Sequence, residues 1–156
     1  MLNDEKDYLS PEKFDELEKE LDHLRSTARR EVLAELEDAK KLGDLSENAE
    51  YHEARKKQAD LEDRVAMLEQ LLKNAAIVSH EKSDFVSMGS TVILKKVGGE
   101  EKTFEIVGTE EADSSQGKLS NKSPIGTALM GKKKGDAVSV KMPAGGFAEY
   151  KIVEVR

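Results

Sequence analysis

Apolar residues recur at helical spacing through the first half of the chain. They follow one another in steps of three and four residues, at Phe14, Leu17, Leu21, Leu24 and Ala28. After Ala28 the steps become four, four and three, which predicts a local interruption of the heptad. Ser10 and Pro11 suit the start of this helix, because serine caps helices and proline is favoured in the first turn. Leu42 and Gly43 suit its end, since glycine accepts the left-handed conformation found there.

A second helical pattern begins within a few residues. Its seam positions have regular heptad spacing and are Ala54, Gln58, Leu61, Val65, Leu68, Leu72 and Ala75. Two helices joined by a short loop must run antiparallel. At about 30 residues each, they predict a helical hairpin roughly 45 Å long. Residues 43–51 would form its tip.

The pattern changes near residue 80. A Ser- and Gly-containing linker is followed by runs that alternate between apolar and polar residues, which predicts strands at 91–97, 102–107, 137–142 and 147–155. Ser123 and Pro124 predict the start of a short helix. We therefore expect an α+β protein, with a coiled-coil hairpin over residues 1–79 and a small α+β domain over residues 80–156.

Composition narrows the functional classes. The net charge of −7 argues against binding nucleic acid over a whole face. There is no cysteine, which excludes disulfides and thiolate metal sites. No apolar run is long enough to cross a bilayer, and the first residues do not resemble a signal peptide. We expect a soluble, cytoplasmic protein that makes no membrane contact.

The tip, GDLSENAEY, places Asp44 and Glu47 three residues apart. One interpretation is structural: the two acids form a capping box and complement the positive end of the second helix. The other is that they bind a hard cation such as Mg²⁺, whose preferred ligands are oxygens. Two carboxylates alone hold Mg²⁺ weakly, so another molecule would have to supply the remaining ligands.

Further tip residues have two interpretations each. If the tip is helical, Tyr51 lies within about 20–40° of both acids and can orient them, or it packs against the first helix. Basic residues lie just behind the tip, at Lys40, Lys41, Arg55, Lys56 and Lys57. They suit a phosphodiester backbone, or they belong to a solvated face with intrahelical pairs such as Glu53 with Lys57.

Two stretches resemble a known family. Residues 43–55, GDLSENAEYHEAR, closely resemble the tip motif of the bacterial transcript cleavage factors of the Gre family. Residues 121–146, NKSPIGTALMGKKKGDAVSVKMPAGG, are similar to the family's C-terminal signature. The resemblance covers nearly the whole chain. It implies an FKBP-like fold for the second half and an accessory factor, not an enzyme in itself, that binds bacterial RNA polymerase through the secondary channel.

The resemblance also implies roles for particular residues. The coiled coil would bring its tip to the polymerase active centre and stimulate cleavage of the nascent RNA 3′ end in backtracked complexes. By position, Asp44 and Glu47 would hold the second Mg²⁺ jointly with the polymerase. Support of the tip or contact with extruded RNA would fall to Tyr51, Lys40, Arg55 and Ser46. Ser123 and Pro124 would lie in a loop that contacts the polymerase, and the protein is expected to be a monomer.

Three other functions remain open from the sequence. A family member can plug the polymerase channel as an inhibitor without promoting cleavage, although the ordinary acid pair at this tip favours cleavage. A prolyl isomerase or peptide-binding module is suggested by the FKBP-like resemblance, but an isomerase pocket needs aromatic walls and aromatics make up only 4% of the chain. A generic coiled-coil tether would leave the tip acids replaceable.

Overall fold

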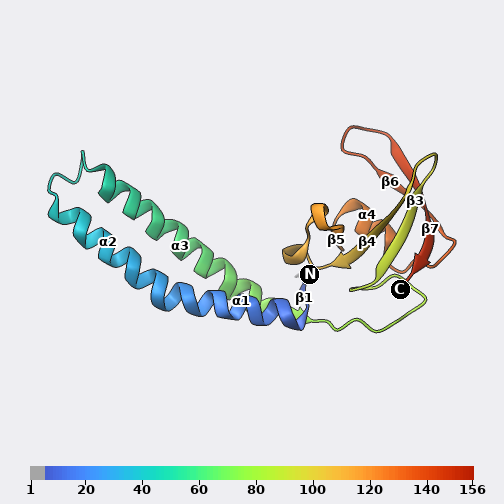
Figure 1. Ribbon diagram of the computed structural model, residues 1–156, viewed down its shortest axis with the longest axis horizontal. Helices are drawn as coiled ribbons and strands as arrows, with labels where there is room; N and C mark the ends of the chain where they lie inside the picture. Colours follow the sequence, from blue (N-terminus) through green and yellow to red (C-terminus); the bar gives the residue numbers. More distant parts are fainter. Residues whose placement is uncertain (1–5) are drawn as a thin grey trace, which may run out of the picture. The chain divides into compact units, whose positions relative to one another are not determined.

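The computed structural model describes residues 6–156, which form two compact units. One unit is the helical hairpin, Phe14–Asn74, and the other combines residues 6–13 with Ala75–Arg156. The α+β fold class predicted from the sequence is confirmed (Figure 1). Within residues 6–156, no helix has the length and apolar character needed to span a membrane.

The hairpin consists of two antiparallel helical arms (Figure 1). The first arm is continuous through three segments and the second is a single helix: α1 (Pro11–His23), η1 (Leu24–Ala28), α2 (Arg29–Lys41) and α3 (Ala49–Asn74). The predicted serine cap is present, because the Ser10 hydroxyl accepts a hydrogen bond from the Lys13 amide at 3.1 Å. At 1.5 Å per residue, the 26 residues of α3 extend roughly 39 Å.

The predicted interruption of the first heptad coincides with η1, which is a turn of π-helix. A π-turn accommodates one extra residue, which is consistent with the three consecutive four-residue steps from Leu24 to Leu36. The Ser26 hydroxyl donates to the Asp22 carbonyl at 2.6 Å within the same stretch, a side-chain bond that tends to bend helices. Apolar residues on both sides of the turn still face the seam, and the buried ones are Leu17, Leu21, Leu36 and Ala39.

The second arm follows the predicted seam until its last turn. Its buried residues are Ala54, Leu61, Val65, Leu68 and Leu71. The prediction was wrong at two positions: Leu72 is only half-buried beside the buried Leu71, and Ala75 is no longer helical. The helix ends at Asn74, so the heptad cannot extend beyond it.

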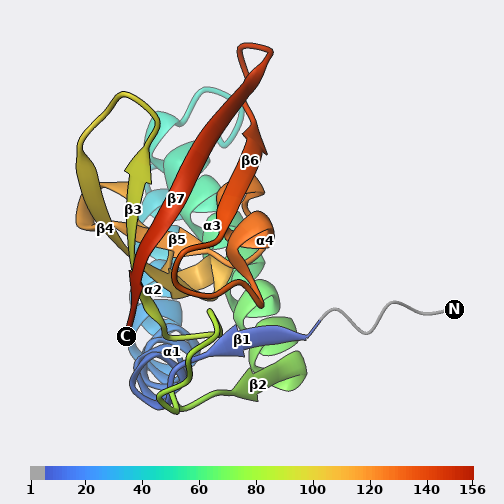
Figure 2. The same cartoon turned by 90° about the vertical axis from the view of Figure 1, so that its right-hand side faces the viewer.

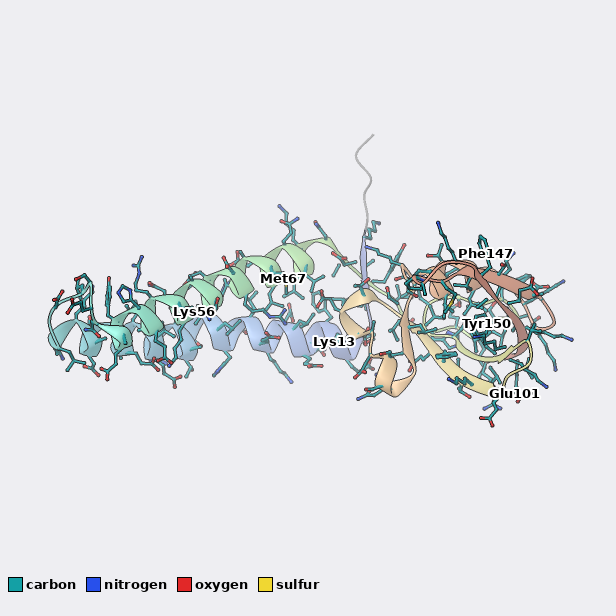
Figure 3. All side chains as sticks on the ribbon, turned by 90° about the horizontal axis from the view of Figure 1, so that it is seen from above. Lys13, Lys56, Met67, Glu101, Phe147 and Tyr150 are labelled. Carbon is teal, nitrogen blue, oxygen red and sulfur yellow. The ribbon has the colours of Figure 1, made fainter. Side chains whose placement is uncertain are left out.

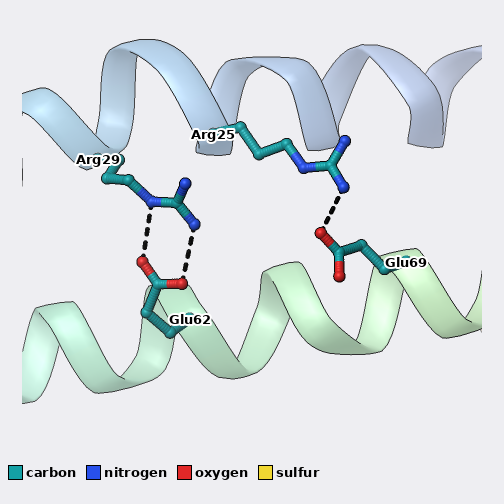
Figure 4. Close-up of polar contacts among 4 residues, drawn as sticks. All are labelled: Arg25, Arg29, Glu62 and Glu69. Carbon is teal, nitrogen blue, oxygen red and sulfur yellow. Dashed lines mark hydrogen bonds and ion pairs between the residues drawn. The ribbon is translucent and has the colours of Figure 1, made fainter.

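Ion pairs join the two arms across the seam (Figure 4). The Arg29 guanidinium donates two hydrogen bonds of 2.9 Å to the Glu62 carboxylate. These bonds raise the pKa of Arg29 above its ordinary value. Arg25 pairs with Glu69 through a single hydrogen bond, from a neighbouring turn. Both pairs are half-exposed and fix the alignment of the arms more than they add stability.

The residues before α1 belong to the second unit. β1 (Asp7–Leu9) pairs in parallel with β2 (Ala75–Ile77), and Leu9 is buried. The Glu111 carboxylate accepts hydrogen bonds from the Ser10 amide and hydroxyl at 3.0 and 2.7 Å. The heptad pattern predicts a hairpin over residues 1–79, whereas these contacts group residues 6–13 with residues 75–156. Strands of three residues show no alternation, which is why the sequence does not reveal them.

The second unit is built on a five-stranded sheet (Figure 2). Its strands are β3 (Thr91–Lys96), β4 (Glu101–Val107), β5 (Lys118–Ser120), β6 (Ala137–Lys141) and β7 (Phe147–Val155), in the order β5-β4-β3-β7-β6. All pairs are antiparallel except β4 with β5. The core is made of the apolar residues Val86, Val92, Leu94, Ile106, Leu129, Val138 and Ile152. The four strands predicted from alternation are present, and β5 was missed.

One short helix, α4 (Pro124–Leu129), completes this unit. As predicted, Ser123 caps it: the hydroxyl accepts a hydrogen bond from the Gly126 amide at 3.0 Å. The same hydroxyl donates to the Ser120 carbonyl at 2.7 Å. Two short 3₁₀ turns, η2 (Thr109–Glu111) and η3 (Ser114–Gln116), connect β4 to β5.

The packing of β1 depends on a glycine. A Cβ atom at Gly108 would lie 1.8 Å from the Tyr8 carbonyl oxygen. We expect Gly108→Ala to lower the free energy of unfolding of this unit by about 1–3 kcal/mol, because backbone must shift to relieve the overlap. Urea unfolding followed by circular dichroism measures the change. Gly99→Ala is the matched control, since its Cβ would meet only Lys96 atoms, the nearest at 3.3 Å; equal stability of the two variants would contradict the expectation.

Candidate functional site

Both candidate acids lie in the loop of residues 42–48 that joins α2 to α3. Asp44 and Glu47 are exposed to solvent. Gly43, with φ of 82°, reverses the chain after α2 as predicted. Asp44 follows with φ of 24°, and it is the one non-glycine residue with positive φ between residues 6 and 156. A positive φ is unfavourable for a side chain of L configuration, so the first acid is held in a strained backbone conformation.

The cap of α3 differs from the prediction. The helix begins at Ala49, and Asn48 caps it by accepting a hydrogen bond from the Tyr51 amide at 3.0 Å. The predicted capping box of Asp44 and Glu47 is therefore wrong. Tyr51 does not share a helical face with the two acids, because neither acid is part of the helix. Asparagine is itself a favoured cap, so the sequence also carries the signal for the cap that forms.

Asp44 is oriented by its neighbours in the loop. Its Oδ1 accepts hydrogen bonds from the Ser46 hydroxyl at 2.8 Å and from the Ser46 amide at 3.3 Å. This is an Asx-type turn, which tolerates unusual backbone angles. The Glu47 amide donates to the Asp44 carbonyl at 3.3 Å. The Glu47 carboxylate has no hydrogen-bond donor among the residues that the structure describes, so it is available to an external ligand.

The first turn of α3 holds the loop from the other side. His52 Nε2 lies 3.2 Å from the Ser46 carbonyl oxygen. The rings of Tyr51 and His52 meet edge to face, with centroids 5.9 Å apart. Tyr51 is half-buried, which agrees with the packing interpretation of this residue. The contact from His52 was not anticipated, because the sequence places this histidine behind the tip.

The donor set of the loop suits part of a magnesium site. Two exposed carboxylates offer the hard oxygen ligands that Mg²⁺ prefers. In the described part of the chain, no three His, Asp, Glu or Cys side chains come together as a metal site would require. The loop fits Mg²⁺ only as one contributor to a site that another molecule completes.

The basic residues behind the loop fall into two groups. Lys57 forms a 2.8 Å ion pair with Glu35 on the opposite arm, and this hydrogen bond raises the pKa of Lys57. Lys41 pairs with Asp38 at 3.3 Å. The solvated-face interpretation of Lys57 is thus supported, although its hydrogen-bond partner is on the other helix and not Glu53.

The second group has no anionic partner within residues 6–156. Lys40, in the last turn of α2, and Arg55, in the second turn of α3, are exposed and form no ion pair there. Lys56, on α3 (Figure 3), is also exposed. These charges are available to bind an anion.

A shallow groove runs along the hairpin next to the loop. It is lined by Glu35, Asp38, Ala39, Leu42, Glu50, Glu53, Ala54 and Lys57. Four of these residues are acidic and one is basic, so the groove repels phosphate. Neither Lys40 nor Arg55 lines it. An anionic chain approaching the loop would therefore be attracted to these two side chains and not to the groove.

Ser123 and Pro124 lie in the other unit and take no part in the loop. The Ser123 hydroxyl already donates one hydrogen bond and accepts another inside its own unit. Pro124 is exposed. Of the two, the proline side chain is the one open to a partner.

Comparison with known proteins gives a consistent result along the chain. The family model described as "Transcription elongation factor, N-terminal" matches residues 7–77. The model described as "Transcription elongation factor, GreA/GreB, C-term" matches residues 81–156. The two matches together cover both units.

Individual relatives agree with the family models. "Transcription elongation factor GreA" of Thermoanaerobacter pseudethanolicus is 47% identical over 95% of this chain and 96% of its own length. The protein of the same name from Geobacillus kaustophilus is 42% identical over the whole of both chains. Among solved structures, the one titled "Crystal structure of GreA factor homolog 1 (Gfh1) protein of Thermus thermophilus" is 26% identical in sequence, and the match covers 97% of this chain and 99% of that chain with a TM-score of 0.45.

The strained backbone at Asp44 leads to a stability prediction. Asp44→Gly removes the hydrogen bonds from Ser46 but relieves the positive φ, whereas Asp44→Ala removes the bonds and keeps the strain. We expect the glycine variant to exceed the alanine variant in hairpin stability by about 1 kcal/mol. Thermal unfolding of both variants under one set of conditions measures the difference. An alanine variant as stable as the glycine variant would show that Asp44 is not strained.

Proposed function

The chain belongs to the GreA/GreB family of transcription elongation factors, and we propose that it binds bacterial RNA polymerase and stimulates the polymerase's own cleavage of nascent RNA. In this proposal the hairpin enters the secondary channel of a backtracked complex. Because the polymerase supplies the catalytic centre, the protein is an accessory factor. We propose that it acts in the cytoplasm as a monomer. The observation that carries the proposal is an exposed pair of carboxylates in the loop at the end of a helical hairpin.

The two acids are proposed to act together with ligands from the polymerase. Asp44 and Glu47 are exposed, and they would hold the second Mg²⁺ of the polymerase active centre jointly with that enzyme. A Mg²⁺ ion bound there stabilises developing negative charge on oxygen and makes hydroxide accessible near neutral pH. Ser46 orients the Asp44 carboxylate through two hydrogen bonds, which keeps this ligand in one position before the partner is met.

The RNA 3′ end is proposed to be held by residues next to the acids. Lys40 and Arg55 are exposed cations without an ionic partner in the described chain, and phosphate is the anion that an extruded RNA presents. The acidic groove supports this choice of surface, because it repels phosphate from the hairpin face that it occupies. Tyr51 precedes Arg55 by one helical turn and supports the tip through its contact with His52.

Docking on the polymerase is proposed to involve the sheet unit. Pro124 is exposed at the start of α4, and its backbone is fixed because Ser123 caps the helix. A rigid exposed turn is suited to recognition, since little conformational entropy is lost on binding. The Ser123 hydroxyl contributes mainly by shaping this turn.

The decisive test removes the negative charge of both acids without changing their shape. We expect the double variant Asp44→Asn, Glu47→Gln to bind polymerase normally but to lose RNA cleavage by on the order of a hundredfold. Shortening of labelled RNA in a defined backtracked complex measures cleavage, and competition with labelled wild-type protein measures binding. The matched control is Glu37→Gln, Asp60→Asn, which removes the same charge from exposed hairpin positions outside the loop.

The outcomes of this test separate the candidate functions. Cleavage by the double variant at the wild-type rate would overturn the role of the acids. Wild-type protein that binds polymerase without shortening the RNA would indicate a channel-binding inhibitor instead.

A second prediction concerns the RNA contact. We expect Arg55→Ala to reduce crosslinking of a photoreactive RNA 3′ end to the tip roughly fivefold, because an exposed phosphate contact contributes about 1 kcal/mol. The effect should decrease as salt increases. Arg30→Ala is the control, since it removes the same charge from an exposed arginine at the start of α2, away from the loop. Equal losses in the two variants would show that Arg55 has no specific role.

A further inference from the structure

One residue of the loop differs from the others in its environment. Residues 42–47 are exposed, whereas Asn48 is half-buried. Asn48 carries no charge, and the proposed metal-binding and RNA-binding residues do not include it. Its side chain nevertheless makes more hydrogen bonds than any other side chain in this loop.

The Asn48 amide connects the ends of both helices. Its Nδ2 donates to the Ala39 carbonyl at 2.7 Å, in the last turn of α2, and to the Gly43 carbonyl at 3.2 Å. Its Oδ1 accepts from the Tyr51 amide at 3.0 Å, in the first turn of α3. One side chain thus gives the Ala39 carbonyl, which also accepts from the Leu42 amide at 3.2 Å, a second donor. It also pairs the Gly43 carbonyl in the loop and the Tyr51 amide, which the first turn of α3 leaves without a helical partner.

This double role requires a side-chain amide. Asparagine offers two donor hydrogens and an acceptor oxygen on one short group. Aspartate would keep the acceptor and still cap α3, but it would place a carboxylate against two carbonyl oxygens. Serine caps helices well but has a single donor. The sequence of the loop is therefore constrained at Asn48 by the end of α2 as well as by the start of α3.

The bridge closes the base of the segment that carries the acids. Asp44 and Glu47 lie between Gly43 and Asn48 in the sequence. The hydrogen bond from the Asn48 side-chain amide to the Gly43 carbonyl links the two ends of this segment directly. Inside the segment the remaining bonds are exposed: the Ser46 hydroxyl donates to Asp44 at 2.8 Å, and the bonds from the Ser46 and Glu47 amides to Asp44 are both 3.3 Å long. Exposed bonds of this kind contribute little alone, so they keep their geometry only while the ends of the segment are fixed.

We infer that Asn48 is a positioning residue for transcript cleavage: by bridging the end of α2 and the start of α3 it holds Asp44 and Glu47 in the arrangement that the polymerase requires. This inference rests on the proposed function. Asn48 touches neither metal nor RNA in this account and acts only through the two acids. A misplacement of catalytic ligands by about 1 Å is enough to reduce a rate substantially.

The test separates two roles of the Asn48 side chain: capping α3 through Oδ1, and bridging to the Ala39 and Gly43 carbonyls through Nδ2. Asn48→Asp keeps the cap of α3 and loses both donors, whereas Asn48→Ala loses all three bonds. Asn74→Asp makes the same chemical change at an exposed position in the hairpin and serves as the control. Three quantities are measured for each protein: the maximal RNA cleavage rate at saturating factor, the factor concentration at half-maximal rate, and hydrogen exchange of the Glu47 and Tyr51 amides in the free protein.

We expect Asn48→Asp to lower the maximal rate roughly tenfold while the half-maximal concentration stays within about twofold of wild type. Exchange at the Glu47 amide should become faster, and exchange at the Tyr51 amide should stay slow because the cap remains. Asn48→Ala should lose protection at both amides. The control should match wild type in all three quantities.

Other results would overturn the inference. A wild-type rate and wild-type exchange in Asn48→Asp would show that the bridge is not needed. Parallel loss of rate and of polymerase binding would mean that the residue acts through general folding. If wild-type protein itself stimulates no cleavage, the proposed function fails. The hydrogen-exchange result still tests the bridge in that case. An unchanged exchange rate of the Glu47 amide in Asn48→Asp would refute the bridge, whereas faster exchange would show that the Asn48 side chain orders the loop.

Discussion

The hairpin depends on a single seam of apolar side chains between its two arms. Each arm is rich in charged residues and presents only one narrow apolar stripe, so neither would be a stable helix alone in water. Half-exposed ion pairs such as Arg29 with Glu62 add little free energy, but they penalise any slip of one arm along the other. The seam therefore fixes the register, and the register decides which residues of the two arms meet at the loop.

At the loop the seam narrows to alanine. Ala39 and Ala54 are the last and first buried residues of their helices, and both line the same groove. Side chains this small allow the two backbones to approach closely, which brings the Ala39 carbonyl within reach of Asn48. A leucine at either position would hold the helix ends apart and break this bond. Packing in the seam and hydrogen bonding in the loop therefore depend on each other: the small side chains of Ala39 and Ala54 allow the bond that the Asn48 amide donates.

Much of this arrangement was accessible from the sequence. The heptads, the glycine turn, the π-turn as an interruption, the Ser123 cap and four strands all follow from periodicity or from residues with narrow conformational preferences. Two features were not accessible. β1 and β2 are three residues each and exist because they pair with each other, so neither has a local pattern. The capping error has a similar origin: Asp44 and Asn48 are both good caps, and the choice between them depends on the Ala39 carbonyl, which lies nine residues away.

Strain and exposure at the loop have a common cause. In the proposed function Asp44 binds a metal held by another molecule, and such a carboxylate has to remain unpaired and hydrated until that molecule arrives, so burial cannot hold it in place. Backbone geometry and short-range hydrogen bonds are the remaining means, and both are found at Asp44, which combines a positive φ with two bonds from Ser46. Among residues 6–156, the hydrogen bonds that shape the loop all come from within Phe14–Asn74. The geometry of the acids is therefore a property of the hairpin alone, whatever arrangement the two units adopt.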